Sequence, residues 1–410
     1  MKVLHISTVQ SGGAGWCAIR INNALVKAGI DSRMLFAEGA GMPCSVKGDV
    51  ARPDKSVYTK FPKLAKIKRF LQRLGTWPFI DADALNIKLE KVNKSHYYLH
   101  QPLSNYKNIA HHPLVEWADV IHLHWVCDFI DYPTFFKEVR KPIVWTLHDK
   151  YPASGVQHSF WDMTPFPDHL KKIDNLCRDI KRKALLETQS LNIVAISEAM
   201  VEVCSNSDVL KGFPITLIHN GVDTEVFHPY DNQKVRKELG LRDDACIFLF
   251  SAYYIHDSRK NLNSVVRALE KLNIPNKVLL CMGNANKQMP DSSFPILLTG
   301  CIRDEEKMAK LYSAADYFIM SSMEETFSQT PLEAMACGTP VISTPVSGAT
   351  DLIRPFNGIV CNGYEADAIE EGITKALAVG YDSNVIRQYI LDNYQYEKIA
   401  AQYINLYDEL

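Results

Sequence analysis

Short β-branched and apolar runs alternate with helical patterns along almost the whole chain of 410 residues. In the first half, these runs cover residues 2–8, 31–38, 119–126, 142–149, 192–197 and 215–221. A second series follows at 247–254, 277–283, 295–300, 317–322, 340–345 and 358–361. Such alternation is typical of parallel sheets built from βαβ units. The sequence therefore predicts an α/β protein with two Rossmann-like, doubly wound parallel sheets that face each other across a cleft.

The length of the chain supports two domains, because 410 residues exceed what one hydrophobic core usually organises. We expect an N-terminal domain over 1–222 and a C-terminal domain over 223–385. Residues 40–115 lack a clean βα rhythm, which indicates an insertion within the first domain. Helical spacing of apolar residues near the end predicts that 386–410 packs back across the N-terminal domain.

Composition excludes several classes of protein. Apolar residues make up 47% of the chain and charged residues 22%, as in an ordinary folded protein. The net charge of −2 disfavours a nucleic-acid partner, which normally requires a basic excess. The ten cysteines are scattered singly, which favours reduced core thiols over a disulfide framework or a structural zinc knuckle. The first residues, MKVLHIST, run directly into a strand pattern, and we expect a cytoplasmic protein.

Two segments of the first domain lie where open α/β sheets bind ligands, beyond the carboxyl ends of strands. Gly12 and Gly13 follow the first strand and precede a helix, so their N–H groups could approach a phosphate. A tight strand-to-helix turn explains the same glycines. His148 ends the strand WTLHD and could hydrogen-bond a sugar hydroxyl or assist proton movement. The alternative is a histidine satisfied by neighbouring backbone.

Two further groups in the first half could suggest a metal. His122 and His124 lie on one face of a strand, but no third ligand is evident at a useful spacing, so packing is the favoured interpretation. Asp81 and Asp83 form an Asp-X-Asp sequence within the irregular insertion rather than at a strand end. We treat that sequence as coincidental, and expect neither a catalytic metal nor a cofactor.

The second domain has the most specific pattern, SSMEETFSQTPLEAMACGTPVIST at 321–344. Glu325 falls in the loop, whereas Glu333 enters the following helix and could offer both carboxylate oxygens to a ribose diol. Free N–H groups at the start of this helix suit a diphosphate. Upstream, Arg259 and Lys260 could neutralise a diphosphate leaving group. Two exposed bases in a loop, and two acids that favour a helix dipole, are the alternatives.

At this point the sequence resembles the retaining GT-B transferases of glycosyltransferase family 4. The resemblance spans nearly the whole chain through GG, HLHW, TLHD, HNGVD, RKN and EAMACGTPVI. It implies catalytic roles for His148, Glu325, Arg259 and Lys260. It also implies donor contacts from Gly12, Gly13, Asn220, Arg259, Lys260, Cys301, Ile302, Glu325, Thr326, Phe327, Ser328, Gln329, Thr330 and Glu333.

The function that the resemblance implies is sugar transfer with retention of configuration. The donor would be a UDP- or GDP-sugar, and the acceptor a saccharide or a lipid-linked saccharide. The pieces HLHW and WTLHD are similar to the branch that builds bacterial exopolysaccharide and O-antigen. The chain departs from the family at Tyr253 and Tyr254, where Gly-Arg is usual, and at Ser328, where glycine is common. A nucleotide-sugar epimerase or hydrolase and a non-catalytic scaffold stay open as alternatives.

A basic stretch lies between residues 55 and 80, with seven Lys or Arg residues and no acid. Apolar residues over 61–74 recur at helical spacing. Such an amphipathic helix could rest on an anionic membrane surface. Packing on its own domain, with the bases in water, is an equal alternative.

Overall fold

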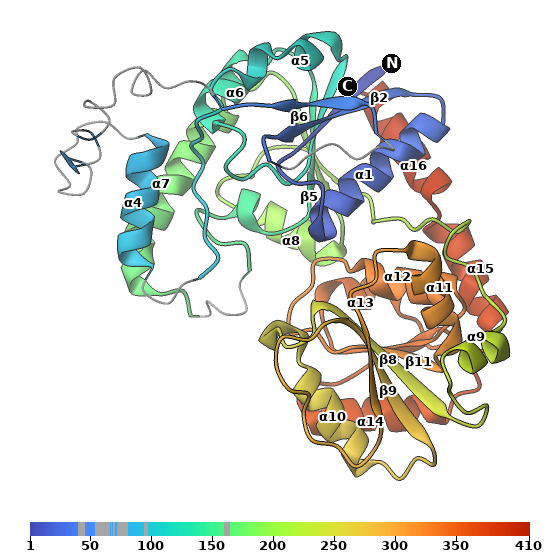
Figure 1. Cartoon of the computed structure of the whole chain (residues 1–410). Helices are drawn as coiled ribbons and strands as arrows, with labels where there is room; N and C mark the ends of the chain where they lie inside the picture. The colour runs from blue at the N-terminus through green and yellow to red at the C-terminus, as the bar shows by residue number, and fades with distance from the viewer. Residues whose placement is uncertain are drawn as a thin grey trace. The chain divides into compact units, whose positions relative to one another are not determined.

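The computed structural model describes residues 1–39, 46–53, 66, 68, 70, 71, 81–93, 97–159 and 165–410. This part of the chain forms two compact units (Figure 1). The first consists of Met1–Ile218 and Ala400–Leu410, and the second of His219–Ile399. Each unit holds one parallel sheet, which confirms the predicted α/β class with two Rossmann-like domains.

The first unit contains a seven-stranded sheet in the order β3-β2-β1-β4-β5-β6-β7, in which all neighbours are parallel. Its strands are β1 (Lys2–Ser7), β2 (Asp31–Ala37), β3 (Gly48–Ala51), β4 (Val120–Leu123), β5 (Ile143–Leu147), β6 (Leu191–Ala195) and β7 (Ile215–Leu217). The chain grows outward in one direction from β1 and in the other from β4. The junction of β1 with β4 is therefore the topological switch point, where such sheets bind ligands.

Helices cover this sheet and bury its near-continuous apolar strands. They are α1 (Gly12–Lys27), α4 (Ala82–Val92), α5 (Pro113–Trp117), α6 (Tyr132–Glu138), α7 (Asp168–Leu185) and α8 (Glu198–Ser205), with short 3₁₀ turns at Ile109–His111 and Tyr151–Ala153. Figure 1 shows α4 beside α7, where the two pack around a small apolar cluster. The last helix, α16 (Tyr396–Asp408), contributes Ala400 onward to this unit.

The second unit contains a six-stranded parallel sheet in the order β10-β9-β8-β11-β12-β13. Its strands are β8 (Cys246–Tyr254), β9 (Lys277–Asn284), β10 (Ile296–Gly300), β11 (Tyr317–Met320), β12 (Val341–Ser343) and β13 (Gly358–Val360). Its helices are α9 (Asn232–Glu238), α10 (Leu262–Lys271), α11 (Glu305–Ala314), α12 (Gln329–Ala336), α13 (Ser347–Leu352), α14 (Ala366–Leu377) and α15 (Ser383–Asn393). Here the switch point lies between β8 and β11.

The segment expected to be an irregular insertion contains regular structure. Gly48–Ala51 adds strand β3 to the margin of the first sheet, and Ala82–Val92 forms α4. Asp81 caps α4 by accepting from the Ala84 N–H at 2.8 Å. Lys68 is buried and lies 3.0 Å from carboxylate oxygens of both Asp81 and Asp83. The Asp-X-Asp sequence therefore has a capping and ion-pairing role.

Most of the basic stretch lies outside the described residues, so its predicted helix over 61–74 is an expectation only. Lys68 is one of its bases, and its ammonium group pairs with acids of the first unit instead of facing water. Among the described residues, no helix is both long enough and apolar enough to cross a bilayer.

Candidate active site

The switch point of the second sheet brings together two loops that the sequence singled out. A 3₁₀ turn, Ser258–Lys260, follows β8, and the loop from Ser321 follows β11. The Met323 N–H donates to the Arg259 carbonyl at 2.7 Å, and the Ser321 hydroxyl donates to the Lys260 carbonyl at 2.7 Å. These bonds fix the backbone of one loop against the other.

Lys260 and Glu325, which are far apart in the sequence, form an ion pair at this switch point. The Ser322 hydroxyl donates to Glu325 Oε1 at 2.8 Å and lies 3.4 Å from the Lys260 ammonium. The side chains of Lys260 and Glu325 are 30% and 16% exposed. Solvent therefore reaches the pair, and an incoming anion could compete with Glu325 for the lysine.

Arg259 has a different partner from its neighbour. Its guanidinium binds Asp257 through two bonds, Nε to Oδ1 at 3.1 Å and Nη2 to Oδ2 at 2.7 Å. Burial alone would raise the pKa of Asp257, but the hydrogen bonds and charge of Arg259 lower it below its usual value. The two predicted phosphate-binding cations are thus adjacent in sequence but separate in their contacts.

The loop before α12 is held from two sides. The Asn220 side chain donates to the Phe327 carbonyl at 3.1 Å, and the His219 ring stacks on Phe327 with centroids 4.9 Å apart. Ser328 precedes α12, but its side chain accepts no hydrogen bond from the N–H groups of the helix. The Ser328 hydroxyl instead lies 3.2 Å from the Thr330 hydroxyl. The residues predicted to touch a donor through backbone groups therefore form one fixed turn.

Glu333 lies one turn inside α12 and is only 2% exposed. Its Oε2 accepts from the Tyr312 hydroxyl of α11 at 2.9 Å. Sequence reasoning missed Tyr312, because nothing in a lone tyrosine on a helix marks it as the partner of an acid. Cys301 and Ile302 follow β10, which β9 separates from the switch point; Cys301 is exposed.

At the first unit's switch point, Gly12 and Gly13 begin α1. Gly12 has φ +73°, a backbone conformation that favours glycine, and a Cβ at either glycine would meet nothing within 4 Å. The first turn is therefore open above these glycines. A Cβ at Gly15 would lie 2.8 Å from the Gln10 backbone, so close packing requires glycine there.

His148 belongs to a row of hydrogen-bonded imidazoles. His148 Nε2 lies 3.0 Å from His124 Nδ1, and His124 Nε2 lies 2.8 Å from His5 Nδ1. Burial lowers the pKa of His148 to about 4 and that of His5 to about 3, and lowers the pKa of His124 well below its usual value. The row is therefore neutral near pH 7.

The sequence revealed no third ligand beside His122 and His124, and the structure shows that His5 lies next to both. Ligand atoms of these three side chains lie within 4.8 Å of one another. His122, however, uses both ring nitrogens: Nδ1 lies 2.6 Å from the Tyr407 hydroxyl, and Nε2 lies 2.7 Å from the Thr146 hydroxyl. This arrangement agrees with the expected packing role of His122.

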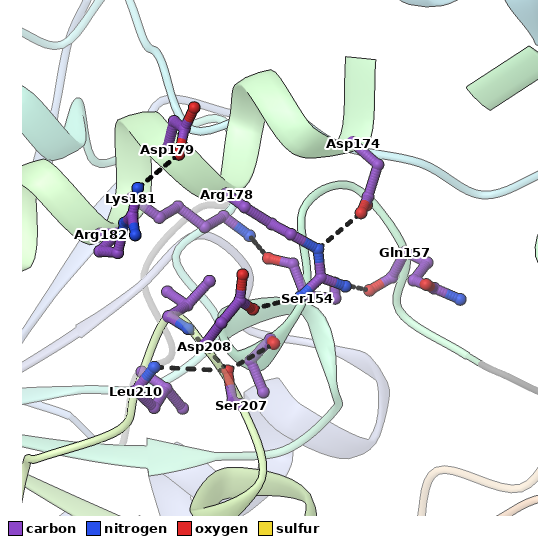
Figure 2. A network of polar contacts seen from close by, with 12 residues as sticks. Ser154, Gln157, Asp174, Arg178, Asp179, Lys181, Arg182, Ser207, Asp208 and Leu210 are labelled. Atoms are coloured by element: carbon purple, nitrogen blue, oxygen red, sulfur yellow. Dashed lines mark hydrogen bonds and ion pairs between the residues drawn. The ribbon is translucent and has the colours of Figure 1, made fainter. Parts of the chain in front are cut away.

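The loop that follows His148 is anchored to α7 (Figure 2). The buried Lys181 ammonium donates to the carbonyls of Tyr151 at 2.7 Å and Ser154 at 3.0 Å. Asp174 accepts from the Val156 N–H at 2.9 Å and also binds Arg178. Burial lowers the pKa of Lys181 to about 7. The loop is thus held in one conformation by buried polar contacts.

A shallow pocket of about 250 Å³ opens elsewhere on the second unit. It is lined by Asp316 and Tyr317 where β11 begins, and by Cys337–Pro340 after α12. This is the amino end of the strands, opposite to the switch-point loops. Open α/β sheets bind ligands at the carboxyl end of their strands, which is where the two loops lie.

Two family models match the chain. One described as Glycosyltransferase Family 4 covers residues 11–226, and one described as Glycosyl transferases group 1 covers residues 231–391. An uncharacterized glycosyltransferase of Methanocaldococcus jannaschii is 25% identical over 315 residues, which are 72% of this chain and 76% of that protein. A D-inositol 3-phosphate glycosyltransferase of Stackebrandtia nassauensis is 28% identical over 45% of this chain, and the match spans 48% of that relative.

Solved structures share the fold across the full chain. Sucrose-phosphate synthase of Thermosynechococcus elongatus matches with a TM-score of 0.66 and 20% identity, covering 100% of this chain and 98% of that one. HepE of Anabaena, solved in complex with UDP and glucose, matches with a TM-score of 0.63 and 16% identity over 100% of both chains. With a family model over more than half of its residues, this chain belongs to glycosyltransferase family 4 and is a glycosyltransferase of the GT-B type.

Proposed function

We propose that this chain transfers a sugar, with retention of configuration, from a nucleotide diphosphate sugar to a saccharide or lipid-linked saccharide. The observation that supports this most is the contact of Lys260 with Glu325 and Ser322 at the switch point of the second sheet. It places a solvent-accessible cation beside Glu325, in the loop that leads into α12. A UDP- or GDP-sugar presents a diphosphate and a diol that such groups can bind.

In the proposed donor complex, the diphosphate takes the place of Glu325 as the partner of Lys260. Helix-start N–H groups of α12 add partial positive charge. Glu333 accepts from the ribose hydroxyls, while Tyr312 holds its carboxylate in position. Glu325, released from the lysine, is then free to accept from hydroxyls of the donor sugar.

The bond between the anomeric carbon and the diphosphate oxygen breaks as negative charge develops on the diphosphate. Lys260 stabilises that charge, because a cation already in place beside the diphosphate does not have to move as the bond breaks. The acceptor hydroxyl forms the new bond on the same face, and its proton passes to the departing phosphate oxygen. His148, kept neutral by burial, can hydrogen-bond a sugar hydroxyl without adding a charge.

HepE of Anabaena, which shares the fold with this chain, was solved with UDP and glucose, and a nucleotide diphosphate sugar is the donor class that we propose for this chain. The proposal also includes a cytoplasmic location, a reaction that needs no metal, and an acceptor from bacterial exopolysaccharide or O-antigen synthesis. A lipid-linked acceptor would lie at a membrane surface, which the basic stretch at 61–74 could bind.

A panel of UDP- and GDP-sugars tests the donor, with thermal stabilisation as the readout, since a bound ligand stabilises the native state by mass action. We expect one nucleotide sugar to raise Tm in the parent chain and to raise it less in Glu333→Gln at the same donor concentration. Donor turnover is then followed with and without saccharide acceptors. Donor breakdown or isomerisation at an unchanged rate without any acceptor would replace transfer with the hydrolase or epimerase alternative. No stabilisation by any donor would favour a non-catalytic scaffold.

A further inference from the structure

A second group of histidines lies in the first unit, apart from the row that contains His148. His100, Cys127 and His158 place ligand atoms within 4.8 Å of one another. They come from three segments: an isolated bridge pairs Leu99 with Gln157, and Cys127 lies in the loop after β4. The His100 N–H donates to the Val156 carbonyl at 3.0 Å, which fixes the two histidine-bearing segments together.

Each of the two imidazoles lies between a carboxylate and the other ring. His158 Nδ1 is hydrogen-bonded to Asp149 Oδ2 at 2.6 Å, and His100 Nε2 lies 3.1 Å from Asp128 Oδ2. The other two ring nitrogens, His100 Nδ1 and His158 Nε2, face each other at 2.7 Å. A cation between these two nitrogens would give both of them a common partner.

The surroundings of these two nitrogens favour a metal cation. Cys127 Sγ lies 3.9 Å from the same His158 Nε2 and is 2% exposed. Carboxylates on the outer nitrogens are the usual second partners of metal-binding histidines, because they fix the ring and its tautomer. Asp128 lies 3.1 Å from His100 and has a left-handed backbone conformation, φ +59°, which Asp adopts more readily than most residues.

We propose that His100, Cys127 and His158 bind one Zn²⁺ ion and leave a fourth position for water or a small ligand. A thiolate with two imidazoles suits zinc and related transition metals, and not Mg²⁺ or Ca²⁺. Tetrahedral zinc needs ligand nitrogens about 3.3 Å apart and sulfur about 3.6 Å from nitrogen. The two rings must therefore separate by about 0.6 Å, while the sulfur moves slightly closer.

The walls of this site suit a fixed ion. The Tyr151 ring stacks on His158 with centroids 4.8 Å apart, and the Trp125 ring meets His100 edge-on at 5.5 Å. The Trp125 N–H also donates to Asp149 Oδ2 at 2.9 Å. The His158 loop is the one that Lys181 and Asp174 anchor to α7 (Figure 2). The ion would join the loops after β4 and β5, independently of the proposed sugar transfer.

The test uses the full chain without a histidine tag, purified with zinc present and no chelator. Metal analysis is expected to find one zinc per chain in the parent and in the matched control Cys177→Ala, which removes another buried thiol of the first unit. Cys127→Ala is expected to lose the ion. Replacement by Co²⁺ should give a thiolate charge-transfer band in the near ultraviolet that Cys127→Ala lacks.

Asp128→Asn keeps the test valid if Cys127→Ala does not fold, because the Asp128 side chain is 53% exposed and Asn tolerates its backbone conformation. Loss of this carboxylate should weaken zinc binding about tenfold to a hundredfold. A parent chain without bound zinc or cobalt would overturn the proposal. Zinc retained in Cys127→Ala but lost in His5→Ala would overturn the proposal and show that the ion binds at His5, His122 and His124.

Discussion

The two switch points differ in how they handle charge. In the second unit the polar side chains are ionised and partly exposed, with Lys260 30% and Glu325 16% accessible. In the first unit the corresponding place is occupied by His5 and His124, which are fully buried and neutral. A partly exposed ion pair can exchange one partner for an anion at little cost, whereas a buried neutral row resists any added charge. The difference is the reason why the proposal gives the diphosphate to the second unit.

The largest expected effect breaks the charged side of this comparison. Lys260→Ala should lower turnover at saturating donor about a hundredfold to a thousandfold, since preorganised donors of this kind contribute about 3–4 kcal/mol. Lys271→Ala is the control, because Lys271 pairs with Asp367 on the same unit but away from the switch point. Added Mg²⁺ or Mn²⁺ should change neither rate. Full activity of Lys260→Ala together with a requirement for Mg²⁺ would show that a metal neutralises the diphosphate.

Glu333→Gln should raise the Michaelis constant for the donor more than it lowers turnover. A charged hydrogen bond contributes about 1.5–3 kcal/mol, so we expect roughly a tenfold to hundredfold rise. Steady-state kinetics with varied donor measure the effect. Tyr312→Phe, which removes only the hydroxyl that holds Glu333, should produce a smaller rise in the same constant. An unchanged donor affinity in Glu333→Gln would show that Glu333 does not bind the ribose.

The neutral side of the comparison predicts a pH dependence of stability. Burial lowers the pKa of His148 from 6.5 to about 4, so the unfolded chain binds a proton in this window that the folded chain does not. Stability is therefore lost as pH falls from 6.5 towards 4, by about 2 kcal/mol at pH 5 for this group. Urea unfolding at pH 7 and pH 5 should show a smaller loss for His148→Gln than for the parent. Equal losses would mean that His148 is not kept neutral by the fold.

Arg259→Ala should have the smallest effect. Its guanidinium is 54% exposed and engaged with Asp257, and exposed pairs of this kind contribute about 0–1 kcal/mol. Turnover should fall less than about fivefold, measured beside Lys260→Ala under the same conditions. A loss as large as that of Lys260→Ala would show that Arg259 leaves Asp257 when the donor binds. The arginine would then replace the cation that Tyr253 and Tyr254 displace from the family pattern.

The fold was predictable because each buried parallel strand is a short β-branched run that stands out locally. Strand β3 was missed, since Gly48–Ala51 is only four residues long and two of its residues are exposed. The proximity of the loops that carry Lys260 and Glu325 follows from the switch-point rule, which brings together segments far apart in sequence, but their ion pair was not predicted. His5 could not be matched with His124 in the same way, because a histidine inside a strand gives no sign of which strand lies beside it. The group His100, Cys127 and His158 was missed because it has no short spacing.

The last residues of α16 complete the interior of the first unit. The Tyr403 hydroxyl lies 2.9 Å from that of Thr146, and the Tyr407 hydroxyl bonds His122. Both tyrosines are translated some 180 residues after Ile218, the last residue of the first part of this unit. At roughly 5–20 residues per second, translation of the second unit delays this closure by about 10–40 s. During that interval Thr146 and His122 of the nascent first unit lack the hydroxyls of Tyr403 and Tyr407. A fragment that stops at Ile218 should therefore be recovered in lower yield than the full chain, and a separate peptide of residues 396–410 should restore it.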